Sequence, residues 1–243
     1  MSQRRMVRRR VLLLVLATMF DGARSAVDGR RIACVGDEFG GDYASALESL
    51  LGSGAVVKDL SVEGATAGPK APWTGSAGAL DAAGRFQPDV AFVLLGHNDA
   101  SDFKGTGNRI ADTFALGIKV ADFHPVYRDQ LSALLRSAPT LTALYVASPR
   151  GSIKDVPRRE SRGGVPRGGL ATMAEIVIEF VDELRRANVF PDIDLVPVDL
   201  AALWADATTC GASPNSPACA AYYASFPRPF QTTTALRGTP LRV

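Results

Sequence analysis

Short apolar segments alternate with helix-forming segments along this chain, and this alternation constrains the fold more than any other feature. The apolar segments are four to six residues long, as expected for strands that a parallel sheet buries on both faces. The expected strands cover Arg31–Val35, Ala55–Leu60, Val90–Leu95, Ala143–Ala147 and Leu195–Val198. The pattern predicts one α/β domain in which helices cover both faces of a five-stranded parallel sheet.

The segments between the expected strands read as helices or loops. Helices are predicted over Asp42–Leu51, from about Val126 to Ser137, and over Leu170–Ala187. His124 precedes the second helix and is predicted to be a surface or cap residue. Pro149–Gly169 is rich in Gly, Pro and Arg and predicts a loop. Its local net charge of +4 suits either an acidic polysaccharide or a solvated loop.

The first 25 residues have the features of a secretory signal peptide. A head with five arginines precedes the apolar run Val11–Phe20, and small residues follow at the spacing of a cleavage site after Ser25 or Ala26. An uncleaved anchor is the alternative, but the run is too short to span a bilayer, which takes about 20 residues. We therefore predict a secreted protein with one domain over residues 26–243 and no stable membrane span after cleavage.

Charge and cysteine content exclude several classes of function. The leader carries six of the 27 Lys and Arg residues and one of the 25 acidic residues, so the remainder has 21 basic and 24 acidic residues. This balance gives no indication of nucleic-acid binding. No spacing typical of metal ligands is present, and no cofactor is predicted. Cys210 and Cys219 flank a polar loop and could form a disulfide after export, whereas Cys34 is predicted to be a buried small residue.

Three short motifs follow the first three expected strands. The first strand runs into Gly36-Asp37-Glu38, the second is followed by a loop that contains Gly64, and the third ends in Gly96-His97-Asn98-Asp99. Loops at the carboxyl ends of neighbouring parallel strands converge on one crevice. The sequence therefore places the three motifs at a common site.

In this arrangement the chain resembles the SGNH (GDSL-type) hydrolases, over roughly residues 31–203. The resemblance implies a flavodoxin-like three-layer α/β/α fold and an ester-hydrolase site. In that family the first motif is Gly-Asp-Ser, whose serine attacks an ester carbonyl. The Gly64 N–H and the Asn98 amide would donate to the oxyanion, and Asp37, His97 and Asp99 would lie around the crevice. The Gly-His-Asn-Asp motif is similar to that of family members that deacetylate pectin-type polysaccharides.

The chain departs from this family at two positions. Glu38 stands where the nucleophilic serine is expected, and no histidine follows His124. The closest match to the family's final Asp-x-x-His motif puts Ser225 at the aspartate and Arg228 at the histidine position. An arginine stays protonated near neutral pH and cannot act as a general base. His97 is the candidate for a displaced base.

Glu38 itself has three possible roles. Its carboxylate could occupy the oxyanion hole and accept from Gly64 and Asn98, it could point into solvent, or it could act as a nucleophile or base. The first interpretation predicts a non-catalytic or weakly active secreted protein that retains a crevice for an acylated glycan or a lipid ester. The alternatives are an active carbohydrate acetylesterase-like hydrolase with a rearranged base, and a structural extracellular protein. Trp73 could stack on a sugar, although packing is its commoner role.

Overall fold

The computed structural model describes residues 29–106, 108–149 and 169–201. Several predictions concern residues outside these ranges. They are the leader over 1–25, most of the basic segment (150–168), the Cys210–Cys219 pair, Ser225 and Arg228.

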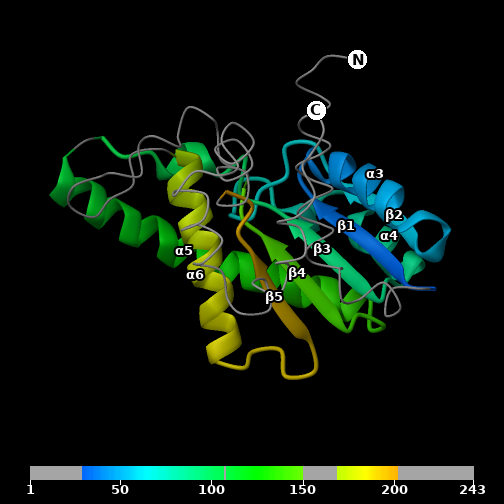
Figure 1. Cartoon of the computed structure of the whole chain (residues 1–243). Helices are drawn as coiled ribbons and strands as arrows, with labels where there is room; N and C mark the ends of the chain where they lie inside the picture. Colours follow the sequence, from blue (N-terminus) through cyan, green and yellow to red (C-terminus); the bar gives the residue numbers. More distant parts are fainter. Residues whose placement is uncertain (1–28, 107, 150–168, 202–243) are drawn as a thin grey trace, which may run out of the picture.

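Five strands form a single parallel sheet (Figure 1). They are β1 (Arg31–Gly36), β2 (Val56–Ser61), β3 (Val90–Leu94), β4 (Ala143–Ala147) and β5 (Asp194–Val198). Their order is β2-β1-β3-β4-β5, which is the flavodoxin-like order. The predicted flavodoxin-like three-layer α/β/α fold with a five-stranded parallel sheet is therefore confirmed.

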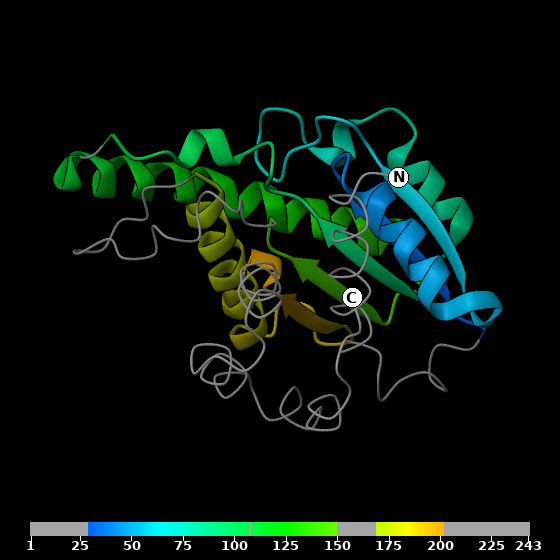
Figure 2. The ribbon, with the colours of Figure 1, turned by 45° about the horizontal axis from the view of Figure 1, so that its top comes forward.

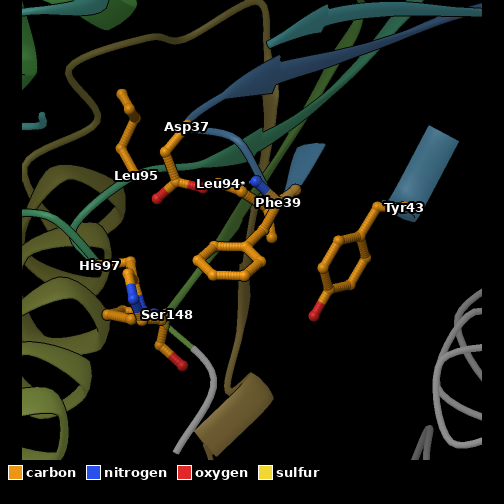
Figure 3. A pocket seen from close by; sticks show the side chains of 8 residues that line it. Asp37, Phe39, Tyr43, Leu94, Leu95, His97 and Ser148 are labelled. Carbon is orange, nitrogen blue, oxygen red and sulfur yellow. Dashed lines mark hydrogen bonds between the residues drawn. The ribbon is translucent and has the colours of Figure 1, made fainter. Parts of the chain in front are cut away.

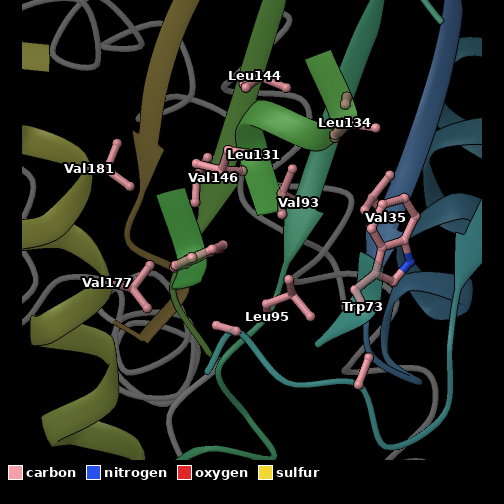
Figure 4. Close-up of a cluster of buried hydrophobic side chains, with 14 of the residues drawn as sticks. Val35, Trp73, Val93, Leu95, Leu131, Leu134, Leu144, Val146, Val177 and Val181 are labelled. Atoms are coloured by element: carbon pink, nitrogen blue, oxygen red, sulfur yellow. The ribbon is translucent and has the colours of Figure 1, made fainter. Parts of the chain in front are cut away.

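Helices pack against both faces of the sheet. They are α3 (Gly40–Leu51), α4 (Ala79–Phe86), α5 (Arg109–Ser137) and α6 (Gly169–Arg186), with short 3-10 turns at η1 (Gly52–Gly54), η2 (Trp73–Gly75) and η3 (Ala100–Phe103). Alternate residues of β1 point to opposite faces. Ile32 and Cys34 pack with α3, whereas Ala33 and Val35 belong to the larger core beneath α4, α5 and α6 (Figure 4).

The register of the sheet aligns the ends of three strands. Gly36, the last residue of β1, pairs with Ser61 of β2 and with Leu94 of β3. The loops that follow these strands therefore leave the sheet at the same edge, which is where the sequence placed the three motifs.

Helix α5 is longer than predicted. It begins at Arg109 and continues through Pro125, whereas the predicted helix began at about Val126. A proline lacks the N–H that would bond to the carbonyl four residues earlier, so it is normally a stop signal. Here the buried residues Phe123 and Tyr127 on either side of Pro125 anchor both halves of the helix in the core. His124 was predicted to be a surface or cap residue. It lies within α5 and is therefore no cap, and its side chain is half-buried, with 24% exposed.

The first half of α5 extends beyond α6, away from the sheet (Figure 2). On it Ile110, Phe114 and Ile118 are 83%, 73% and 53% exposed, and their spacing of four residues places them on one side of the helix. Across the described ranges, no helix combines the length and apolarity needed to cross a membrane.

Candidate active site

The site begins where Gly36 turns the chain out of the sheet. Its φ is +144°, and an added Cβ would lie 1.8 Å from the backbone oxygen of Leu94. The Asp37 N–H donates to that same oxygen at 2.9 Å. Only glycine allows β1 to approach β3 this closely, and the approach directs Glu38 towards the loops after β2 and β3.

The carboxylate of Glu38 accepts two hydrogen bonds from these loops. Its Oε2 atom lies 3.1 Å from the Gly64 backbone nitrogen and 3.0 Å from Nδ2 of Asn98. Gly64 has a φ of +75°, a left-handed conformation that glycine adopts without strain. The backbone N–H of Glu38 also interacts with the carboxylate. We call these three donors (the N–H groups of Glu38 and Gly64 and the amide of Asn98) the cradle.

The cradle keeps Glu38 ionised. Partial burial acts to raise the pKa of Glu38, but the hydrogen bonds from the cradle outweigh it, with a smaller contribution from nearby His97. The pKa therefore lies below its ordinary value. The side chain is nevertheless exposed, so water reaches the carboxylate while the donors hold it.

Asp99 and Gln130 hold the loop that carries Gly64. The buried carboxylate of Asp99 accepts from the N–H groups of Ala67 and Gly68 at 2.8 and 2.7 Å. Burial raises the pKa of Asp99, while these two hydrogen bonds oppose the rise. Gln130 of α5 donates to the carbonyl oxygens of Thr66 and Ala67. The sequence analysis did not identify Gln130 as a site residue. Its position one helical turn after Tyr127, on the buried side of the helix, is the pattern that could have indicated it.

Asp37 lies beneath the turn and is 2% exposed. Burial raises its pKa to about 7, and the neighbouring charges of Glu38 and Asp99 act in the same direction. Hydrogen bonds from the backbone N–H groups of Phe39 and His97 oppose the rise. Asp37, Phe39 and His97 line a small pocket beside the cradle (Figure 3). The rings of Phe39 and His97 pack edge to face there, with their centroids 4.5 Å apart.

Ser148, which directly follows β4, is buried and also lines this pocket. Its hydroxyl lies 3.4 Å from Oδ1 of Asp199, beyond the end of β5. The motif analysis did not single out Ser148, because no family motif covers it.

The structure brings together most of the residues singled out in the sequence. Glu38, Gly64 and Asn98 are joined by hydrogen bonds, and Asp37, His97 and Asp99 surround them. Arg228 lies outside the described residues.

Three further residues discussed in the sequence analysis pack within the fold and do not contact Glu38. The side chain of His124, on α5, faces α6, where its Nδ1 atom lies 3.5 Å from Oε2 of Glu183. Trp73 is buried and donates to the Leu60 carbonyl oxygen at 2.9 Å, which is the packing role. Cys34 is fully buried, as predicted.

The exposure of Glu38 limits how much its hydrogen bonds stabilise the fold. When Asn98→Ala removes one donor, water can replace it, so we expect a coupling energy between positions 38 and 98 below about 1 kcal/mol. A buried carboxylate would lose about 1–3 kcal/mol. A double-mutant cycle of Asn98→Ala and Glu38→Gln, followed by urea unfolding, measures the coupling. A value of about 2 kcal/mol or more would contradict the exposed position of the carboxylate.

Comparisons with known proteins find similar solved structures. No protein-family model and no curated protein matches the chain. A salicylyl-acyltransferase from a tetracycline biosynthetic pathway is 16% identical with a TM-score of 0.46, over 88% of this chain and 56% of its own. A mutant of an acetyl-xylooligosaccharide esterase from Geobacillus is 16% identical with a TM-score of 0.45, over 89% of this chain and 98% of its own.

A GDSL-like lipase from Bacteroides thetaiotaomicron is 9% identical with a TM-score of 0.36, over 76% of this chain and 78% of its own. Of the salicylyl-acyltransferase described above, the match covers little more than half of the length. All three identities are 16% or lower and all three TM-scores are below 0.5, so these structures carry no argument about what the chain does.

Proposed function

We propose that this chain is a secreted SGNH-hydrolase-like protein, non-catalytic or weakly active, whose oxyanion hole is filled by its own Glu38. The observation that carries this proposal is the pair of hydrogen bonds from Gly64 and Asn98 to one carboxylate oxygen, at 3.1 and 3.0 Å. In an active esterase, donors in these positions would stabilise the charge that develops on the substrate oxygen. A carboxylate already held there leaves these donors unavailable to the substrate.

The side chains at the nucleophile and base positions are also poorly suited to catalysis. The pKa of Glu38 is lowered, which makes its carboxylate a weaker base and a poorer nucleophile. The arginine at position 228 cannot take a proton near neutral pH. We infer that ester hydrolysis is lost or slow, while the crevice still accommodates an acylated glycan or a lipid ester. The basic head and apolar run of residues 1–25 support export of a domain that covers residues 26–243.

An active esterase with His97 as a displaced base is the second candidate. The observation that favours it is the position of His97, which lies near enough to Glu38 to lower its pKa and lines the adjoining pocket. A purely structural extracellular role is the third candidate, and it predicts neither hydrolysis nor ligand binding at the crevice.

Hydrolysis of p-nitrophenyl acetate tests the leading proposal. We expect the intact protein to hydrolyse this ester no faster than Glu38→Ala or the matched control Glu63→Ala, which removes the exposed acid that precedes Gly64 in the chain. Glu38→Ser should also stay inactive, because it restores the hydroxyl without a base to activate it. Turnover abolished by Glu38→Ala would establish a carboxylate mechanism, and turnover abolished only by His97→Ala would establish the displaced base.

A further inference from the structure

The cradle is built independently of the carboxylate that it holds. Nδ2 of Asn98 donates to the Ala65 carbonyl oxygen at 3.1 Å as well as to Glu38, so this amide keeps one partner when Glu38 leaves. The loop after Gly64 is fixed from below by Asp99, whose two hydrogen bonds to backbone N–H groups measure 2.8 and 2.7 Å. Neither contact involves Glu38, and the donors should therefore keep their orientation without it.

Gln130 adds a second support to the same loop. Its amide donates to the carbonyl oxygens of Thr66 and Ala67 at 3.1 and 2.7 Å, and its oxygen accepts from the Thr74 N–H. Gln130 is 4% exposed and Asp99 is 4% exposed, so water competes little for these contacts. Donors fixed by buried groups form a preorganised site, which binds an anion without a cost of ordering the loop.

The ligand in this site is exchangeable because it is exposed. Glu38 and Gly64 both lie at the surface, and only the flexible side chain of Glu38 connects its carboxylate to the backbone. A carboxylate that is tethered in this way competes with free ligands at an effective concentration on the order of millimolar or above. Removing the tethered carboxylate should therefore open the cradle to free carboxylates.

We infer that the cradle is a carboxylate-binding site that Glu38 fills as an internal ligand, and that free organic acids bind there when Glu38 is displaced. This inference rests on the proposed function, because it concerns the same site. It adds that the cradle itself binds carboxylate anions in preference to neutral esters. The reason is charge: N–H donors form shorter and stronger hydrogen bonds with an ionised oxygen than with a neutral carbonyl. A nearby His97 also favours the anionic form of the group in the cradle.

The test is a titration of sodium acetate into Glu38→Ala at constant ionic strength, followed by NMR. The readouts are the backbone amide of Gly64 and the side-chain amide of Asn98. We expect saturable shifts at both groups, with an apparent affinity at least about tenfold higher than in the intact protein, because the tethered competitor is gone. Methyl acetate, which has the same acyl group without the charge, should bind at least about tenfold more weakly than acetate.

Two controls make the result specific. Glu63→Ala loses an exposed acid beside Gly64 and should bind acetate no better than the intact protein. Glu38→Ala combined with Asn98→Ala should lose the saturable shift at Gly64. No saturable shift in Glu38→Ala, or equal binding of methyl acetate, would overturn the inference. These outcomes are independent of ester hydrolysis, so failure of the carboxylate site and failure of the proposed function give different results.

Discussion

Gly36→Val is expected to prevent the protein from folding to a stable native state. Any Cβ at this position would lie 1.8 Å from the Leu94 carbonyl oxygen and 2.6 Å from its carbon. Both atoms are backbone in the neighbouring strand, so the carboxyl ends of β1 and β3 would have to separate. We expect a loss of more than about 4 kcal/mol, which lies in the exceptional range for one substitution and approaches the whole stability of many domains. Urea unfolding followed by circular dichroism measures it.

Gly117→Ala is the matched control for Gly36→Val. Gly117 lies within α5, and an added Cβ there meets nothing within 4 Å. Alanine is favoured over glycine in a helix by up to about 1 kcal/mol, so this variant should be as stable as the intact protein or slightly more. A Gly36→Val protein that unfolds at the same urea concentration as the intact protein would contradict the close approach of β1 and β3.

The stability of the protein is expected to fall by a few kcal/mol, up to about 4, between pH 4 and pH 7. The reason is Asp37, whose pKa burial raises from 3.8 to about 7. Between these two values the folded state binds more protons than the unfolded state, so stability is highest below pH 4 for this group and is lost as the pH rises through 7. Glu38, with its lowered pKa, acts in the opposite direction, but in the lower range below its ordinary value of 4.5.

Asp37→Asn separates this contribution from those of other groups. Asparagine has nearly the same shape and can still accept from the Phe39 N–H, which donates to Asp37 at 3.1 Å, but it does not titrate. The decline in stability between pH 4 and 7 should therefore become much smaller in this variant. Asp99, whose pKa is also raised, should account for part of what remains. An unchanged pH dependence would mean that Asp37 is not the buried acid responsible.

The sheet and the meeting of Glu38, Gly64 and Asn98 could be predicted from the sequence. Strands buried on both faces are continuous apolar runs, and the carboxyl ends of parallel strands determine where their loops converge. These two facts depend only on residue type and chain order. They were sufficient to place the three residues, up to 60 positions apart in the sequence, at one edge of the sheet, where the structure joins them by hydrogen bonds.

The helices were harder to predict because their limits depend on tertiary contacts. Pro125 indicated a helix start, yet burial of Phe123 and Tyr127 carries α5 across it. Helix α4 was not predicted, because it has only eight residues and contains Gly84, and glycine weakens a helical pattern. Its place is set by buried contacts of Ala83 and Phe86 with the core, which no local pattern reveals.

The exposure of Glu38 could not be predicted either. Sequence pattern places its carboxylate at the crevice, but the depth of the crevice depends on how far the loops after β2 and β3 project. Gly64 and Glu38 both lie at the surface, which reduces the expected coupling energy below the value for a buried pair.

Because β2 is an edge strand of the sheet, the two sides of the cradle differ in local stability. Gly64 follows β2, which pairs only with β1, whereas Asn98 follows β3, which has a strand on each side. Most of β2 is exposed or half-buried, but four of the five residues in β3 are buried. An edge strand opens locally at a lower free energy than a central strand. The Gly64 side of the cradle should therefore detach during brief fraying of β2, while Asn98 and Glu38 stay in place on the intact centre of the sheet.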